Sequence, residues 1–132
     1  MYMLDTNMCI YALKSNPQIA SSLLKQNFDK GICISSITLS ELMFGVENSS
    51  NVQKNTQALV RFLLPFSILS FSENAAIEYG KIRAYLQKQG TPIGPLDTLI
   101  AAHAKAENCI LVTHNTKEFN RVVDLQVEDW VL

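Results

Sequence analysis

The sequence lacks the features of secreted and membrane-spanning proteins. Its 132 residues include only three cysteines, an odd number without a Cys-x-x-Cys pair, so neither a disulfide framework nor a cysteine-based zinc site is predicted. The longest apolar stretches fall far short of the roughly 20 residues that a membrane span needs. Met1 is followed almost at once by a short apolar run, with no basic leader. We therefore expect a cytoplasmic protein that does not enter a membrane.

An excess of basic residues is also missing. Eleven Lys and Arg residues stand against twelve Asp and Glu, which gives a net charge of −1. Proteins that bind nucleic acid mainly through phosphate contacts carry a basic face, so this balance argues against that class. It is compatible with an enzyme whose site is acidic. The 48% of apolar residues suffice for one core, which predicts a single domain over residues 1–132.

Short apolar runs alternate with segments of helical spacing. The predicted strands cover residues 2–4, 32–34, 67–71, 110–112 and, as an edge strand, 127–131. The predicted helices cover residues 8–14, 16–27 with Asn16 as the cap before Pro17, 38–46, 52–64, 72–89 with Ser72 as the cap, and 96–108. Short, wholly apolar strands separated by helices are typical of a parallel sheet that is covered on both faces, which is an α/β fold.

Three polar residues follow the predicted strands, and a fourth lies at the start of a predicted helix from which it could face the same edge. In open parallel sheets, ligands bind beyond the carboxyl ends of the strands. Asp5 directly follows the first strand, and Glu41 lies early in the helix after the second. Asn115 comes three residues after the strand that ends at Val112, and Asp97 lies in the first turn of a helix opened by Gly94-Pro95. These positions predict a polar site at one edge of the sheet.

A carboxylate cluster has two interpretations, and the pattern alone leaves both open. Carboxylate oxygens are the ligands of hard cations such as Mg²⁺, and a bound metal lowers the pKa of a water and stabilises charge on a phosphodiester. The structural alternative assigns each acid to its helix. Asp5 then caps the helix that follows it, Glu41 forms a capping box with Thr38, and Asp97 interacts with a helix dipole.

Several segments resemble one family. They comprise MLDTN at residues 3–7, ISSITLSEL at 34–42 with Gly45, PLDTLIA at 95–101, and VTHN at 112–115 followed by Phe119. Together they resemble the PIN-domain ribonucleases and, more narrowly, the VapC toxins of bacterial type II toxin–antitoxin pairs. The resemblance runs in order through essentially the whole chain.

The resemblance implies a three-layer α/β/α PIN-like domain with a central, mainly parallel sheet, and a metal-dependent endoribonuclease that uses Mg²⁺, with Mn²⁺ able to substitute. By position, Asp5 and Asp97 are the principal metal ligands. Glu41 is the third acid, which either ligates the metal or orients its water, and Thr6 supports the site by hydrogen bonding.

The fourth site position differs from many PIN domains. Asn115 stands where those proteins carry an acid, and its amide supplies a ligand oxygen without a charge. A second metal would therefore bind more weakly. Glu118 is near in sequence, but three residues further on we expect it to point elsewhere.

The string at residues 89–97 and the ending Glu128-Asp129-Trp130 resemble the enterobacterial-type branch of the family. That resemblance implies a single cut in the anticodon stem-loop of initiator tRNA. It also implies a VapB-like antitoxin that occludes the acidic site, a toxin homodimer, and a higher hetero-oligomer with the antitoxin. The apolar faces of the helices at 52–64 and 72–89 are candidate dimer surfaces.

Two further readings of function remain. A phosphatase of the haloacid dehalogenase type needs a second aspartate two residues after the first, where this chain has Asn7. A PIN-like module that binds an antitoxin or RNA without cleaving it is the more serious alternative, with Asn115 as a first sign of lost activity. Outside the acidic set, His103 is expected to be structural, His114 is a candidate substrate contact, and Arg83 is expected to pair with a buried acid rather than with RNA phosphate.

Overall fold

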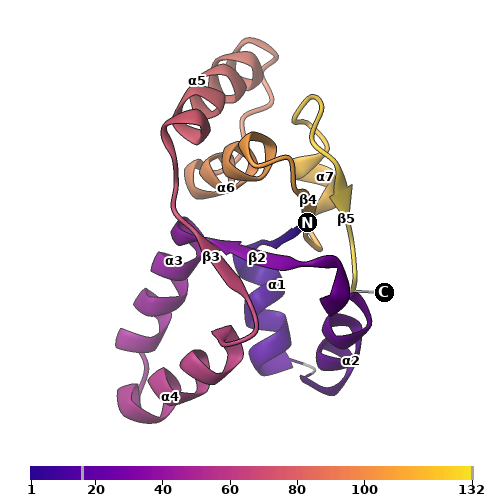
Figure 1. Ribbon diagram of the computed structural model, residues 1–132. Helices are drawn as coiled ribbons and strands as arrows, with labels where there is room; N and C mark the ends of the chain where they lie inside the picture. The colour runs from indigo at the N-terminus through magenta and orange to yellow at the C-terminus, as the bar shows by residue number, and fades with distance from the viewer. Residues whose placement is uncertain (16, 132) are drawn as a thin grey trace.

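A five-stranded sheet forms the centre of the molecule, with helices on both faces (Figure 1). The computed structural model describes residues 1–15 and 17–131. The strands are β1 (Tyr2–Leu4), β2 (Ile32–Ser35), β3 (Ser67–Leu69), β4 (Ile110–Val112) and β5 (Val127–Glu128). Their order is β3-β2-β1-β4-β5, and each described pairing is parallel. The strand that carries Asp5 at its end is therefore the middle one.

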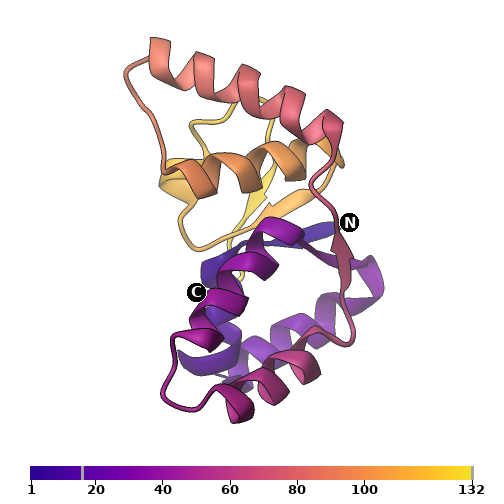
Figure 2. The same ribbon diagram turned by 90° about the vertical axis from the view of Figure 1, so that its left-hand side faces the viewer.

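The helices connect successive strands. They are α1 (Thr6–Ile10) continued by a π-helical turn (Tyr11–Ser15), α2 (Pro17–Asn27) with a 3₁₀ turn (Phe28–Lys30), α3 (Ser36–Glu47), α4 (Val52–Leu63), α5 (Glu73–Lys88), α6 (Pro95–Ala106) and α7 (Thr116–Phe119). Helices α5 and α6 lie together on one face of the sheet, and α1 to α4 lie on the other (Figures 1 and 2).

The alternation of side chains along each strand separates two cores. Successive residues of a strand point to opposite faces, so residues in register share a face. One aligned set packs with α5, α6 and α7, and consists of Met3, Cys33 and Leu111. The next set packs with α1, α3 and α4, and consists of Leu4, Ile34 and Val112. The three-layer α/β/α prediction is confirmed, and the sheet is parallel throughout its described pairings.

The predicted start of one helix is wrong, and the error matters for the site. The helix expected to begin at Thr38 begins at Ser36, because Ser35 is its N-cap and accepts a hydrogen bond from the Ile37 N–H at 3.1 Å. Thr38 is therefore inside the helix and buried, and the capping box predicted for Thr38 and Glu41 does not form. Glu41 is free for another role.

Other boundaries differ at the element ends. The predicted helix 8–14 is divided between α1 and the π-helical turn, and the two edge strands end earlier than expected, at Leu69 and Glu128. Helix α7 was not predicted. Ser72 caps α5 as expected, through the Ala75 N–H at 3.1 Å. Helix α2 covers the predicted segment from Pro17, while its predicted cap, Asn16, lies outside the described residues.

The three cysteines are buried free thiols, as the sequence predicts. Their apolar surroundings make them part of the two cores. Within the described residues, no helix combines the length and the apolarity that crossing a membrane requires.

Candidate active site

Asp5 lies just beyond the carboxyl end of the middle strand. Its backbone N–H donates to the Val112 carbonyl at 3.0 Å, which extends the pairing of β1 with β4 by one residue. Its side chain is the N-cap of α1 and accepts from the Met8 N–H at 2.8 Å. The residue is only 2% exposed. The capping role is therefore real, and it holds the carboxylate at the point where a site is expected.

The electrostatic state of Asp5 is unusual. Burial raises the pKa of this carboxyl from 3.8 to about 6, against the opposing effect of hydrogen bonds from Thr113 and Met8. The negative charges of Asp97 and Glu41 raise the pKa further. A buried carboxylate with acidic neighbours destabilises the fold when it is ionised, unless a positive charge compensates it.

Glu41 is aimed by a contact that spans two helices. The Thr6 hydroxyl, at the start of α1, donates to Oε1 of Glu41 on α3 at 2.7 Å. The same Thr6 oxygen lies 3.4 Å from the hydroxyl oxygen of Thr38, which is buried beside it. Thr6 thus fixes the carboxylate of Glu41 next to Asp5, in the supporting role that the family resemblance implies.

Asp97 lies in the first turn of α6 and is half-buried. Burial is the main cause that raises the pKa of its carboxyl, followed by the charges of Glu118 and Glu41. The structure therefore brings Asp5, Glu41 and Asp97 within electrostatic reach of one another. The expectation that Glu118 points elsewhere is wrong, because its charge acts on Asp97 more strongly than that of Glu41 does.

Asn115 is connected to Asp5 through Thr113, whose side chain hydrogen-bonds Asp5, and no hydrogen bond of the Asn115 side chain is found among the described residues. Asn115 is the residue before α7, and its backbone N–H donates to the Thr113 hydroxyl at 2.9 Å. The same short helix carries Glu118. The assignment of Asn115 to the site stays a prediction.

The donor set fits a hydrated hard cation. Among the ion pairs described, those of His103, Lys105 and His114, none engages Asp5, Glu41 or Asp97. Among the described residues no three His, Cys, Asp or Glu side chains are close enough to enclose a metal directly. Mg²⁺ binds through one or two carboxylates and keeps several waters, so a loose group of acids without a basic partner suits it.

Both histidines have partners outside the cluster of Asp5, Glu41 and Asp97. His103 is fully buried, and its Nδ1 lies 2.7 Å from the Ser35 hydroxyl, which agrees with a structural role. His114 is exposed and its Nδ1 lies 3.0 Å from Oδ2 of Asp129.

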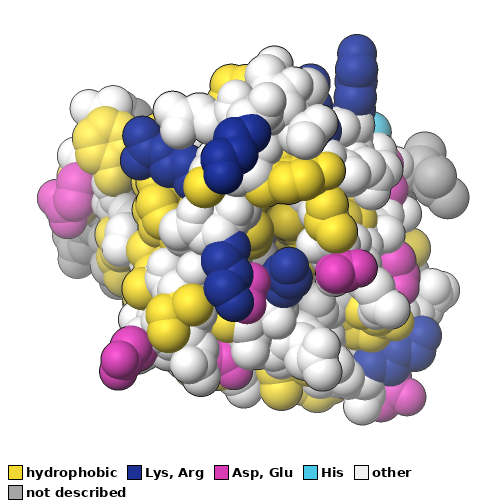
Figure 3. All heavy atoms as spheres, turned by 90° about the horizontal axis from the view of Figure 1, so that it is seen from above, with side chains coloured by type: hydrophobic (Ala, Val, Ile, Leu, Met, Phe, Trp, Pro, Cys, Tyr) yellow, Lys and Arg dark blue, Asp and Glu magenta, His cyan; other side chains and the backbone are white. Residues whose placement is uncertain are grey.

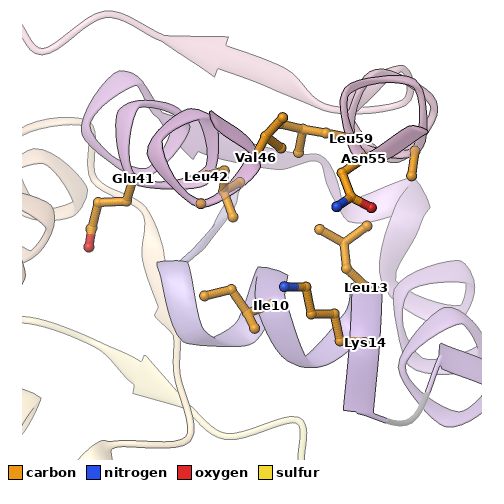
Figure 4. A pocket seen from close by; sticks show the side chains of 10 residues that line it. Ile10, Leu13, Lys14, Glu41, Leu42, Val46, Asn55 and Leu59 are labelled. Carbon is orange, nitrogen blue, oxygen red and sulfur yellow. The ribbon is translucent and has the colours of Figure 1, made fainter. Parts of the chain in front are cut away.

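An apolar cavity of about 150 Å³ adjoins Glu41. It lies between the π-helical turn, α3 and α4, with Glu41 at one end and Asn55 at the other (Figure 4). Its walls are mainly aliphatic and include Ile10, Leu13 and Leu59, and the amine of Lys14 also reaches it. A partner seated in this groove would lie directly beside the acidic cluster.

Comparisons with known proteins agree with this geometry. The PIN domain model matches residues 2–125. The tRNA(fMet)-specific endonuclease VapC of Shigella flexneri is 44% identical over 98% of this chain and 97% of its own. The crystal structure of VapBC2 from Rickettsia felis bound to a promoter DNA fragment matches with a TM-score of 0.94 and 42% identity, and covers 98% of both chains.

A more distant structure shares the same architecture. FitAcB from Neisseria gonorrhoeae matches with a TM-score of 0.86 at 31% identity, over the full length of both chains. PIN-domain nucleases generally depend on divalent metal ions, in agreement with the uncompensated acids at the sheet edge. The chain belongs to the PIN-domain family and, within it, to the VapC ribonucleases of toxin–antitoxin systems.

Proposed function

We propose that this protein is a toxin that hydrolyses RNA phosphodiester bonds with Mg²⁺, and that Mn²⁺ can substitute. The observation that carries the proposal is the state of Asp5, a buried carboxyl with a pKa raised to about 6 and two further acids beside it. Such a cluster is costly for the fold and is explained by a cation that compensates it. The VapC relatives named as endonucleases and ribonucleases support the same reaction.

Each acid has a distinct task in this proposal. Asp5 and Asp97 would hold the metal, and Glu41, oriented by Thr6, would be the third acid. When bound, the metal would lower the pKa of a water and stabilise charge on the phosphate. The rigid contacts of Asp5 with Met8 and of Glu41 with Thr6 keep these carboxylates in place before substrate arrives.

Glu118 supplies the charge that Asn115 lacks. An amide oxygen can ligate a metal, but a carboxylate also attracts it. We propose that one metal binds tightly near Asp5 and Asp97, and that Asn115 and Glu118 contribute to the outer side of the site. A second ion would then bind more weakly or arrive with the substrate.

The substrate that we propose is initiator tRNA, cut in its anticodon stem-loop, in the cytoplasm. Relatives from Shigella flexneri and Salmonella typhimurium, 44% and 40% identical, are named tRNA(fMet)-specific endonucleases. A folded hairpin also suits a chain with a net charge of −1, because RNA loops are recognised through shape and unpaired bases as well as through phosphates.

We propose further that a VapB-like antitoxin occupies the groove beside Glu41. Several structural relatives are VapBC complexes, and an apolar groove that leads to the acids is a suitable seat for an inhibitory segment. Exposed apolar side chains on α3 and after α4, above all Phe44 and Leu64, support a toxin homodimer and higher assemblies with the antitoxin.

The decisive experiment is a cleavage assay with antitoxin-free protein. Total RNA and purified initiator tRNA are incubated in Mg²⁺, in Mn²⁺ and in EDTA, with the wild type and with Asp5→Ala and Asp97→Ala. Asp29→Ala is the matched control, since Asp29 is an exposed aspartate before β2, at the opposite end of the sheet.

We expect a metal-dependent cut by the wild type and the control, and none by the two site variants. A discrete fragment from the anticodon stem-loop would support the proposed substrate. If folded wild-type protein cuts no RNA with either metal, the proposed activity is wrong, and the PIN-like binding module takes its place.

A further inference from the structure

A second cavity lies on the other side of the first turn of α6. It measures about 210 Å³ and is formed between α5 and the loop that leads into α6. Its lining combines an aromatic ring, a guanidinium group and small apolar surfaces, contributed by Tyr79, Arg83, Leu86, Pro92, Ile93 and Pro95. Gln87 and Thr98 complete the wall.

Arg83 is the unusual residue of this cavity. It is exposed, and its guanidinium donates to the Tyr79 hydroxyl at 3.1 Å, with the guanidinium carbon 6.0 Å from the ring centre. The buried acid that we expected as its partner is not found, because no salt bridge of Arg83 is present in the described part of the chain. The positive charge is therefore held in place and remains available to an anion.

The cavity and the acidic cluster share a short segment of backbone. Pro95 and Thr98 line the cavity from the helical turn that carries Asp97. Gly94, which precedes that turn, is close to the acid as well, since a Cβ atom at Gly94 would lie 3.9 Å from Oδ2 of Asp97. A ligand in the cavity would therefore be a near neighbour of a ligand at the metal site.

A second cation supports the loop. The guanidinium of Arg121 donates to the Pro92 carbonyl at 3.1 Å, which fixes the outer rim of the cavity and adds positive charge there. The face seen from the side of α5 carries several lysine and arginine side chains among hydrophobic ones, with a few Asp and Glu side chains beside them (Figure 3). An aromatic ring beside a guanidinium, as in this cavity, is a common element of surfaces that bind single-stranded nucleic acid.

Another cavity on α5 is a weaker candidate. It measures about 230 Å³ and includes Lys81, Tyr85 and Lys105. The ammonium of Lys105, however, is 3.6 Å from the carboxylate of Glu78, so part of its charge is already compensated. The Tyr79–Arg83 cavity has both a guanidinium with no ion pair among the described residues and the nearness to Asp97.

We propose that the Tyr79–Arg83 cavity binds one unpaired nucleotide of the RNA substrate, next to the phosphodiester that is cut. The base would pack on the Tyr79 ring and the proline and isoleucine walls, and Arg83 would contact the phosphate of that nucleotide. This inference rests on the proposed ribonuclease function and adds a specificity-determining subsite to it.

The test compares RNA binding and cleavage for three variants. Arg83→Gln removes the charge but keeps hydrogen-bond donors, Tyr79→Leu removes the ring, and Tyr79→Phe keeps the ring but loses the hydroxyl that holds Arg83. Lys88→Gln is the matched control, because Lys88 is an exposed cation of the same helix that does not line the cavity. Binding of a hairpin with an unpaired loop is measured by fluorescence anisotropy in EDTA, and kcat and KM in Mg²⁺.

We expect Arg83→Gln and Tyr79→Leu to weaken hairpin binding and to raise KM by about tenfold or more, with kcat within about twofold of the wild type. Tyr79→Phe should lie between them and the control. For Arg83→Gln, the plot of log affinity against log salt concentration should also become less steep. Its negative slope should shrink in magnitude by roughly 0.7, the value for one phosphate contact to a single strand.

The inference is overturned if Arg83→Gln and Tyr79→Phe bind the hairpin and cut it as Lys88→Gln does. These two variants test the inference even if Tyr79→Leu fails to fold. Both should fold, because Arg83 is exposed and a phenylalanine at position 79 keeps the packing of the ring. A failure of the ribonuclease proposal looks different. In that case wild-type protein cuts nothing in Mg²⁺, while the anisotropy in EDTA still reports whether the cavity binds RNA.

Discussion

Replacement of Asp5 by asparagine should make the metal-free protein more stable while it removes activity. Asparagine is nearly isosteric with aspartate and is an equally good N-cap, so the hydrogen bond from the Met8 N–H is kept. What the variant loses is a negative charge at a position only 2% exposed. A preformed cation site keeps its acids close together, so it destabilises the fold when the cation is absent.

The magnitude follows from the pKa of Asp5. Because the pKa is raised from 3.8 to about 6, the ionised form costs the folded state about 3 kcal/mol relative to the unfolded chain. The upward direction of the pKa shift determines the pH range in which stability is lost. A raised pKa of an acid leaves stability intact below about pH 4, lowers it progressively between about pH 4 and pH 6, and causes no further loss above that range.

The assay is urea denaturation of wild type and Asp5→Asn in EDTA, at pH 4.5 and at pH 7.5. At pH 7.5 the variant should be more stable by up to about 3 kcal/mol, and at pH 4.5 by only about 1 kcal/mol, because the folded protein still holds the Asp5 proton there while most unfolded chains have lost it. Asp29→Asn is the control, because that aspartate is exposed and should give no difference at either pH.

Added Mg²⁺ should reverse the order at pH 7.5. A ligand that binds only the folded state stabilises it in proportion to the logarithm of its concentration, and the variant lacks the carboxylate that we propose as a metal ligand. If Asp5→Asn is less stable than the wild type in EDTA at pH 7.5, or if the difference does not depend on pH, then Asp5 is not a destabilising buried anion and the reasoning fails.

Three further substitutions test the rest of the site and the core. Thr6→Val, which removes the hydroxyl that donates to Glu41, should lower kcat by about tenfold with little change in the unfolding curve. Glu118→Gln should raise the Mg²⁺ concentration needed for half-maximal cleavage by about tenfold, and Asn115→Ala should raise it by less, as measured by Mg²⁺ titration of activity. The opposite order would make Asn115 the stronger contributor. Leu59→Ala, at a position 2% exposed, should lower the free energy of unfolding by about 2–4 kcal/mol in urea denaturation.

The sheet and the position of the principal acids were predictable from the sequence. Runs such as Ile32-Cys33-Ile34 and Ile110-Leu111-Val112 have few alternatives to buried strands, and parallel strands place their carboxyl ends together. Asp5 follows such a run directly, so its place at the sheet edge required no knowledge of side-chain contacts.

The role of Glu41 was harder to predict, because local and long-range signals conflict there. Ser35 and Thr38 are both good caps, and the pattern around Thr38 and Glu41 matches a capping box. The deciding contact is the hydrogen bond from Thr6, which comes from 35 residues away in the sequence. Local sequence rules do not contain that contact.

Glu118 was misjudged for a different reason. Helix α7 has four residues, which is too short for the periodic pattern that identifies helices. Once a helical turn follows Asn115, a residue three positions further on returns to the same side as Asn115 and lies near Asp97. The sequence contains a signal for this turn, since Asn115 and Thr116 are residues that favour a helix start.

The acidic cluster and its surroundings together explain how a nearly neutral chain can act on RNA. The carboxylates repel phosphate unless a cation is bound, so RNA affinity has to come from groups around the cluster. Arg83 lines the cavity beside the first turn of α6, and Arg121 contacts the loop before that turn through the Pro92 carbonyl, so we propose that these cations supply part of the affinity. RNA bound at the rim of the cavity would then be repelled by the carboxylates when the metal is absent and attracted to the site when the metal is bound. Substrate binding and metal binding therefore strengthen one another, and the net charge of the whole chain says little about either.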